Sequence, residues 1–186
     1  MFKRLEIPEV FVFTPQRFTD DRGYFVQTYN RNLIETMTGP LDWVQDNQSL
    51  SHRRGTVRGL HFQISPFAQN KLVRCVRGAI LDVALDIRHG SPTFGCHVAA
   101  TLTAEGGEQI FVPKGFAHGL VTLEDQSEVA YKVTSFYSAD HDRSIRWNDA
   151  SLGIDWGIGE AGAILSAKDA SAPMLADTPE YFRYDA

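Results

Sequence analysis

The sequence lacks the features that mark secreted, membrane-spanning and disulfide-stabilised proteins. Its two cysteines, Cys75 and Cys96, have no close cysteine partner, which favours buried thiols in a reducing compartment over a disulfide framework. No apolar run approaches the roughly 20 residues that a membrane helix needs. The first residues also lack the apolar segment of a signal peptide. We therefore expect a cytoplasmic protein without a membrane partner.

An excess of basic residues is also absent. The 18 lysines and arginines are outnumbered by 23 aspartates and glutamates, which gives a formal net charge of -5. No overall positive field therefore exists to hold a nucleic acid backbone, and any phosphate must be bound by local cations. Hydrophobic residues make up 43% of the chain, which excludes wholesale disorder.

The chain shows no internal repeat and no low-complexity stretch. Its 186 residues are enough to bury one sizeable core. We expect a single domain over residues 1–186, with a C-terminal tail that starts at about residue 157.

Short strand-like segments recur along the chain, and turn signals such as Arg77-Gly78 and Ser91-Pro92 separate them. Helix is expected only at residues 31–37 and in parts of the tail. The pattern predicts an all-β fold, a jelly-roll (cupin-like) sandwich or barrel with a few short helices. The nine expected strands cover residues 24–28, 44–49, 56–63, 71–76, 80–86, 97–102, 108–112, 119–123 and 129–136.

The segment from residue 80 to residue 88 alternates strictly between two kinds of side chain. Leu81, Val83 and Leu85 fall on one face, and Asp82 and Asp86 fall on the other. The apolar face is expected to pack into the core. Periodicity alone leaves three environments open for the polar face, namely solvent, a partner chain or a ligand cavity.

Three side chains on different predicted strands suggest chemistry next to a carbonyl group. His61 lies in a strand-like segment with apolar flanks, Lys71 begins another strand, and Tyr131 lies in a third. A base, a cation and a phenol are the groups needed to move a proton beside a carbonyl. The alternative for His61 is a hydrogen-bonded structural histidine.

Cations also gather near these residues in a chain that is acidic overall. Arg58, Lys71, Arg74 and Arg77 are close in sequence, which suggests an anionic ligand, although a solvated strand edge is an equal explanation. His118 follows a predicted turn. It either meets a ligand at the mouth of the barrel or bonds a carbonyl group.

Metal chemistry is the natural alternative for a cupin-like fold. The metal motif requires two histidines separated by one residue, but the matching segment here reads His61-Phe62-Gln63. The other histidines have no short ligand spacing, so a metal site is disfavoured. The nucleophile elbow of hydrolases and the phosphate-binding P-loop are both missing from the sequence.

Several blocks, in order along nearly the whole chain, resemble the dTDP-4-dehydrorhamnose 3,5-epimerase family. An ordered series of blocks is more specific than any single motif. The blocks are Val44–Asn47, Val57–Gln63, Asn70–Cys75, Asp82–Arg88, Ser91–Gly95, Val112–Gly119, Tyr131–Lys132, Ile145–Asp149 and Leu165–Asp169.

This resemblance implies a reaction and a role for four residues. The substrate is a dTDP-linked 4-keto-6-deoxy sugar, dTDP-4-dehydro-6-deoxy-D-glucose, inverted at C3 and C5 to give dTDP-4-dehydro-L-rhamnose for deoxysugar synthesis. His61 is the implied base, with Asp169 as the carboxylate that fixes its tautomer. Lys71 stabilises the enolate oxygen, and Tyr131 returns the proton on the opposite face of the sugar. No cofactor is implied, because the ketone itself makes the protons acidic.

The resemblance also implies substrate contacts and a homodimer whose N-terminal strand is exchanged or paired between subunits. Gln27 replaces a commonly acidic residue and Asp142 a usual Glu, which puts binding rather than chemistry in doubt. Arg22 and Arg58 suit pyrophosphate oxygens, and Tyr137 either stacks near the ligand or packs in the core. The implied binding residues are Arg22, Gln27, Gln45, Asn47, Arg58, His118, Tyr137, Asp142 and Lys168.

Three other functions remain open from the sequence. One is an epimerase that inverts only C3 or only C5, because the sequence does not resolve small shifts around the sugar. Another is a metal-dependent cupin enzyme, which Gln63 argues against. The last is a non-catalytic sugar-binding module, for which the joint presence of His61, Lys71, Tyr131 and Asp169 would be a coincidence.

Overall fold

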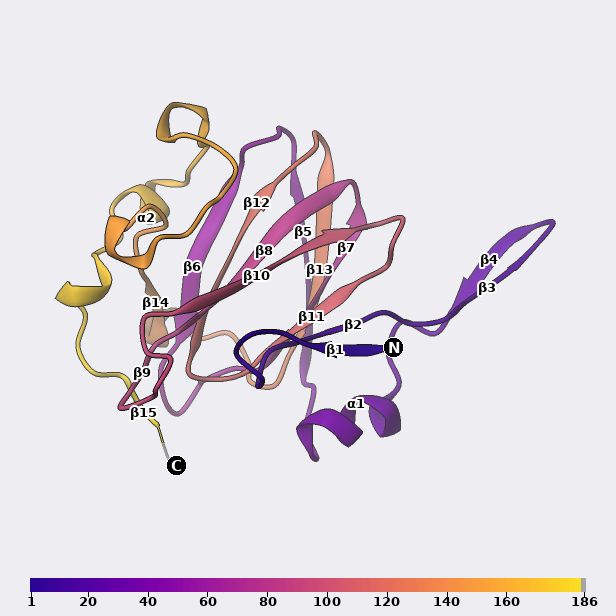
Figure 1. The fold of residues 1–186 in the computed structure, drawn as a ribbon, viewed down its shortest axis with the longest axis horizontal. Coiled ribbons are helices and arrows are strands. Elements are labelled where there is room, and N and C mark those ends of the chain that lie inside the picture. Colours follow the sequence, from indigo (N-terminus) through magenta and orange to yellow (C-terminus); the bar gives the residue numbers. More distant parts are fainter. Residues whose placement is uncertain (185–186) are drawn as a thin grey trace.

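The computed structural model describes residues 1–184, and its main body consists of two β-sheets that face each other (Figure 1). The first sheet has six strands in the order β1 (Phe2–Arg4), β2 (Phe11–Phe13), β11 (Gln109–Val112), β7 (Lys71–Arg77), β13 (Ser127–Val133) and β5 (Gln45–Ser51). The second has five strands in the order β10 (His97–Thr103), β8 (Ala79–Asp86), β12 (Phe116–Thr122), β6 (Val57–Gln63) and β14 (Asp142–Ser144).

Smaller elements surround the two sheets. Two further strand pairs are β3 (Arg17–Asp20) with β4 (Gly23–Val26), and β9 (Arg88–His89) with β15 (Phe182–Arg183). The α-helices are α1 (Arg31–Thr38) and α2 (Ala167–Ala170), and the 3₁₀ turns are η1 (Ala139–His141), η2 (Ala150–Leu152), η3 (Glu160–Gly162) and η4 (Leu175–Asp177). Within residues 1–184, no helix has the length and apolar character needed to cross a membrane.

The predicted all-β jelly roll with few helices is confirmed. All nine predicted strands and the helix at 31–37 are present, with ends that differ by a few residues. The largest difference at the start of a strand concerns β12, which begins at Phe116 rather than at Gly119. The predicted turn is present at Lys114 and Gly115, but β12 begins directly after it, so His118 lies inside a paired strand.

Side-chain alternation divides the apolar residues among three clusters. The inner cluster lies between the two sheets and includes Val73, Ala84 and Leu120. A second cluster covers the outer face of the five-stranded sheet, where the chain after Ile145 packs against residues such as Val83. A third includes Phe11 and Ile34, so it joins the six-stranded sheet to α1. The two faces of the five-stranded sheet pack against different clusters. A slip of one residue in the strand pairing would turn each side chain to the opposite face, so this packing fixes the register.

The alternating segment at residues 80–88 is buried on both faces. Val83 and Leu85 pack against the chain after Ile145, which we call the C-terminal segment. Asp82 and Asp86, on the opposite face, are 0% exposed. Solvent is therefore not the environment of the polar face, and each carboxylate needs partners inside the protein.

The two cysteines differ in environment. Cys75 is buried in β7 as expected, and burial raises the pKa of its thiol to about 11. Cys96 is exposed, so the expectation of a second buried thiol was wrong. The reason is its position in the turn before β10, where its backbone N–H bonds to the carbonyl of Thr93.

Candidate active site

A cavity of about 360 Å³ lies between the two sheets, beside the inner apolar cluster. Side chains from both sheets line it, so a ligand inside would be contacted from two opposite sides. The lining residues are Gln45, Asn47, Ser49, Arg58, His61, Phe62, Gln63, Gln69, Lys71, His118, Leu120, Val129, Tyr131, Tyr137 and Asp142.

The wall formed by the five-stranded sheet carries two histidines side by side. His61 on β6 is directly opposite His118 on β12 in the strand register. The strands approach closely just before this pair, where a Cβ atom on Gly59 would be 2.6 Å from Cα of Gly119. Gly59 also has a φ of +125°, a conformation that L side chains rarely adopt. Glycine at both positions therefore sets the placement of the two imidazoles.

His61 forms a close pair with a carboxylate from the C-terminal segment. Its Nε2 atom is 2.5 Å from Oδ1 of Asp169 on α2. Ser166, at the N-cap of α2, donates from Oγ to Oδ2 of Asp169 and accepts the Asp169 backbone N–H. Burial raises the pKa of Asp169, but the hydrogen bonds from His61 and Ser166 outweigh burial and hold this pKa below its ordinary value. The carboxylate therefore engages Nε2 and leaves Nδ1 of His61 as the nitrogen available to take a proton.

Lys71 is a buried cation next to this pair. Its Nζ donates to the carbonyl oxygen of His61 at 3.3 Å. Burial lowers the pKa of Lys71 to about 8, although Asp82 and Asp142 favour the charged form. An ammonium group with such a pKa is positioned to stabilise negative charge that develops on a bound ligand.

Tyr131 approaches from the opposite wall of the cavity. It lies on β13 of the six-stranded sheet, whereas His61 lies on β6 of the other sheet. Burial raises the pKa of Tyr131, so its hydroxyl is protonated at neutral pH. A base on one wall and a proton donor on the other are what an inversion at carbon requires.

His118 is paired with Asp82, a residue to which the sequence analysis gave a face but no role in the site. The Nε2 atom of His118 is 2.9 and 3.0 Å from the two carboxylate oxygens of Asp82. The available signal was the polar face of the alternating segment at residues 80–88, which left three environments open for Asp82. The structure shows that a carboxylate on this face contacts the cavity histidine.

Polar side chains surround the rest of the cavity. Arg58 donates to Oγ of Ser51 at 3.1 Å and to the carbonyl of Leu50 at 3.0 Å, which holds its guanidinium in place. Gln45 donates to Asn47 at 2.7 Å and accepts the backbone N–H of Tyr137. All four of these predicted binding residues line the cavity and contribute to its polar surface.

Asp142 closes one side of this surface. It accepts from Nζ of Lys168 at 2.5 Å and from the hydroxyl of Tyr137 at 3.3 Å. Lys168 immediately precedes Asp169 on α2, so the ion pair ties the helix that holds the base partner to strand β14. Tyr137 is 61% exposed, which excludes the core-packing explanation for it.

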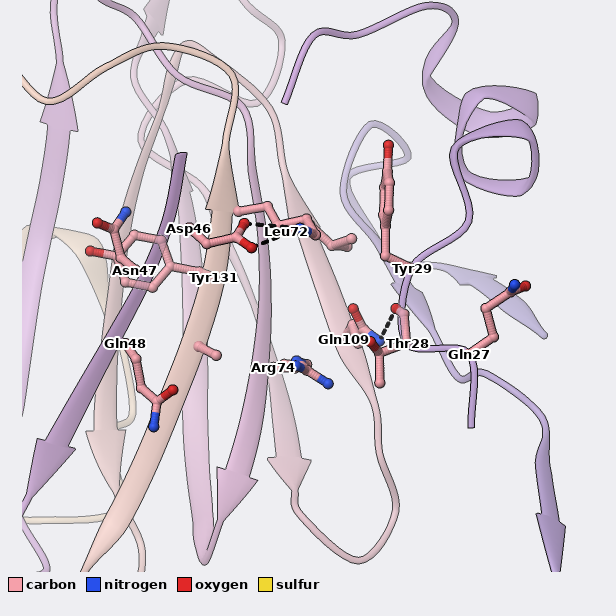
Figure 2. Close-up of a pocket in the computed structure, with 12 residues that line it drawn as sticks. Gln27, Thr28, Tyr29, Asp46, Asn47, Gln48, Leu72, Arg74, Gln109 and Tyr131 are labelled. Carbon is pink, nitrogen blue, oxygen red and sulfur yellow. Dashed lines mark hydrogen bonds and ion pairs between the residues drawn. The ribbon is translucent and has the colours of Figure 1, made fainter. Parts of the chain in front are cut away.

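Three predicted binding residues do not line this cavity in their own chain: Arg22, Gln27, and Lys168, which reaches it only through its ion pair with Asp142. Arg22 is at the tip of the β3–β4 hairpin, which projects away from the body, and it pairs with Asp20 (Figure 1). Gln27 lines a second cavity of about 600 Å³, together with Asp46 and Arg74 (Figure 2).

The predicted cluster of cations does not form one site. Lys71 faces the cavity between the sheets, whereas Arg74 lines the second cavity. Arg77 is exposed at the end of β7 and pairs with Glu128 at 2.9 Å. Strand alternation thus separates side chains that are close in sequence.

Gln63, at the position of the second histidine of the metal motif, has a structural role. Its amide donates to the carbonyls of Phe67 and Phe136 and accepts the backbone N–H of Ser138. Across residues 1–184, no three histidine, cysteine or carboxylate side chains are grouped closely enough to hold a metal ion.

Comparison with known proteins identifies similar sequences and structures. A family model described as dTDP-4-dehydrorhamnose 3,5-epimerase matches residues 4–177. A relative of that name from Sinorhizobium fredii is 49% identical, with 98% of this chain and 93% of the relative covered. The Escherichia coli relative is 46% identical, with 89% of each chain covered.

Solved structures agree with the sequence comparisons. The Legionella pneumophila epimerase RmlC, in complex with dTDP-4-keto-L-rhamnose, superposes with a TM-score of 0.95 at 39% identity, covering 100% of this chain and 99% of that one. ChmJ, a 3'-monoepimerase from Streptomyces bikiniensis in complex with dTDP-quinovose, superposes with a TM-score of 0.86 at 32% identity, covering 93% and 87%.

Proposed function

Because this chain belongs to the dTDP-4-dehydrorhamnose 3,5-epimerase family, we propose that the cavity between its two sheets is the site of that reaction. The chain is an epimerase that inverts C3 and C5 of dTDP-4-dehydro-6-deoxy-D-glucose in dTDP-rhamnose biosynthesis. Both carbons are adjacent to the C4 ketone, so loss of either proton gives an enolate. The residues that perform these steps are our proposal.

The observation that carries the proposal is the pairing of His61 with Asp169 on the wall opposite Tyr131. His61 removes the proton through Nδ1, and Asp169 stabilises the imidazolium that results. Tyr131 then donates its hydroxyl proton to the other face of the carbon, which inverts the configuration. The imidazolium and the tyrosinate return to their starting states by proton exchange with solvent.

Lys71 supplies the electrostatic stabilisation of the enolate. Its ammonium is buried in the cavity, where a fixed charge is worth more than in water. Removal of one such donor typically costs on the order of 10² to 10³ in rate. The reaction as proposed uses side chains of the protein and no cofactor.

The polar side chains around the cavity are proposed to hold the rest of the substrate. Arg58 and Lys168 are the cations suited to the diphosphate. Gln45, Asn47 and Tyr137 form the connected surface beside them. The other proposed contacts are His118, which faces the sugar from β12, and Asp142, which bridges Lys168 and Tyr137.

We also propose that the chain acts as a cytoplasmic homodimer of single-domain subunits. The β3–β4 hairpin exposes Phe18, Tyr24 and Phe25 at 55%, 60% and 70%, and such a set of apolar side chains suits contact with another protein surface. A second copy would also give Arg22 and Gln27 a site to act on. Sedimentation analysis of wild type beside a Phe18→Ser/Phe25→Ser variant tests this, since a monomeric wild type would contradict it.

Proton NMR in D₂O tests the reaction directly. The chelator-treated protein is incubated with dTDP-4-dehydro-6-deoxy-D-glucose, and deuterium incorporation at C3 and C5 is followed. We expect exchange and inversion at both carbons. If C3, C5 or both fail to exchange, the result contradicts the proposal.

Inversion at one carbon is the second candidate function. ChmJ, a 3'-monoepimerase, shares the fold at 32% identity, so this fold can also support inversion at one carbon. Exchange at C3 alone in the same NMR experiment would identify this narrower reaction.

A further inference from the structure

Asp82 is a buried carboxylate to which the proposed chemistry assigns no role. It lies on β8, is 0% exposed, and accepts from Nε2 of His118 through both oxygens. In the part of the chain that the structure describes, its hydrogen-bond partner is this imidazole and not a lysine or an arginine. The question is therefore which cation balances its charge.

His118 does not provide that cation. Burial lowers the pKa of His118, and this effect outweighs the opposing effect of Asp82. The imidazole is therefore neutral near pH 7 and donates its Nε2–H to the carboxylate. A neutral partner satisfies hydrogen bonding but leaves the buried charge of Asp82 uncompensated, which is costly in a protein interior.

Lys71 has the complementary problem. Its ammonium is buried, and the acceptor within reach is the neutral carbonyl of His61 at 3.3 Å. The charged groups that act on Lys71 are Asp82 from β8, Asp142 from β14 and Lys168 from α2. The other titratable groups that line the cavity with it are Arg58 and His61 from β6, His118 from β12, Tyr131 from β13, and Tyr137 from the segment after β13.

The remaining carboxylates near the cavity already have partners. Asp142 is 2.5 Å from Lys168, and Asp169 is 2.5 Å from His61. Asp82 is thus the carboxylate left to balance Lys71, and the two opposite charges share the interior without a direct hydrogen bond.

Resting on the function proposed above, we infer that Asp82 is a positioning residue that keeps Lys71 positively charged while fixing the tautomer of His118. The enolate needs the ammonium form of Lys71, so the carboxylate acts on the reaction through the lysine. Burial lowers the pKa of Lys71, and the negative charge of Asp82 opposes this effect. Removal of that charge therefore lowers the pKa of Lys71 further below about 8. As the pH is raised, a variant without this charge should therefore lose epimerase activity at a lower pH than the wild type does.

The Asp82→Asn variant separates charge from hydrogen bonding, because the amide oxygen still accepts the Nε2–H of His118. The measurement is kcat and kcat/KM from about pH 5.5 to about pH 9. We expect the alkaline limb to move down by about one pH unit or more, so that the ratio of wild-type to variant rate grows about fivefold or more between pH 6 and pH 8. A rate lowered by the same factor at every pH would overturn the inference and leave Asp82 a structural role.

Asp86→Asn is the matched control. Asp86 lies on the same strand and face with the same burial, but its carboxylate is held by Arg88, Ser91 and Thr93. We expect this variant to lose thermal stability while its alkaline limb stays in the wild-type position. If the wild type has no epimerase activity, the proposed function is wrong. If the wild type is active but Asp82→Asn keeps the wild-type alkaline limb, only the inference about Asp82 is wrong.

A second measurement covers the case in which Asp82→Asn does not fold. Carbon NMR of wild-type protein labelled at lysine Cε, with the Lys71 signal assigned through a Lys71→Arg variant, reports the titration of Lys71 directly. We expect a charged Lys71 at pH 7 and a titration near pH 8. A neutral Lys71 at pH 7 would overturn the inference, because Asp82 would then support no cation there.

Discussion

The Nε2 atom of His61 lies 2.5 Å from Oδ1 of Asp169, although 108 residues separate them in the sequence. The contact depends on the C-terminal segment, which crosses the outer face of the five-stranded sheet and then places α2 against β6. Asp169 is 3% exposed and is held by Ser166 at the helix N-cap. The tail is therefore part of the candidate active site.

The Asp169→Asn variant should lose activity through the base. The amide carries no charge to stabilise the imidazolium, so we expect kcat to fall by about 10² to 10⁴ with little change in KM. Ser166→Ala is the control, because it removes one hydrogen bond to the Asp169 carboxylate and the N-cap bond to the Asp169 backbone N–H but keeps the charge, and it should cost about tenfold or less. Equal losses in the two variants would show that the charge of Asp169 is unimportant.

The Tyr131→Phe variant should separate proton loss from inversion. His61 still removes the proton, but the opposite wall lacks a donor, so deuterium exchange persists while the yield of inverted sugar falls. NMR of the recovered sugar measures both quantities. The control is Tyr29→Phe, since the Tyr29 hydroxyl is buried without a hydrogen-bond partner within residues 1–184 and its loss should leave both unchanged. Full inversion by Tyr131→Phe would exclude this phenol as the donor.

The Lys168→Met variant should weaken substrate binding more than chemistry. Loss of one cation suited to the diphosphate is expected to raise KM and the Kd for dTDP by about tenfold, with kcat nearly unchanged. Titration calorimetry with dTDP measures the Kd. Lys3→Met, which removes a charge from the exposed strand β1, should leave the Kd at its wild-type value. An unchanged Kd in Lys168→Met would remove Lys168 from the binding surface.

The Gly59→Ala variant should disturb the fold at the two histidines. Its Cβ would be 2.6 Å from Cα of Gly119 and 2.7 Å from the carbonyl oxygen of His118, at a φ of +125°. We expect a destabilisation of about 1–3 kcal/mol, seen as a lower Tm, together with reduced kcat. Gly153→Ala adds a methyl group into open space at a φ of +60°, so it should cost only backbone strain and less than Gly59→Ala. A wild-type Tm in Gly59→Ala would show that the strands separate easily at this point.

The strands of the jelly roll could be predicted from sequence because most of them carry a local signal. Residues 80–88 alternate, and Gly and Pro mark the turns around them. The short strands β1, β14 and β15 carry no such signal, since two or three residues show no periodicity. They form because neighbouring strands offer unpaired backbone groups, which only the assembled fold provides.

The residues of the candidate site could be predicted where the family resemblance supplied them. Residues whose role depends on which side chains the fold brings together were harder to predict. His61 and Asp169 were predicted as partners, and their contact is present. The role of Asp82 required the fold, because alternation shows which residues share a face but not what that face meets. Arg74 was grouped with Lys71 by sequence proximity, and the pleat of β7 separates them.

The most direct test of the mechanism compares wild type with a His61→Asn variant in D₂O, following deuterium at C3 and C5 of the sugar by proton NMR. If His61 is the base for both carbons, the wild type exchanges both positions and the variant, with a native circular dichroism spectrum, exchanges neither above the rate of the uncatalysed control. Exchange by the variant at either carbon, at the wild-type rate, would contradict the role of His61.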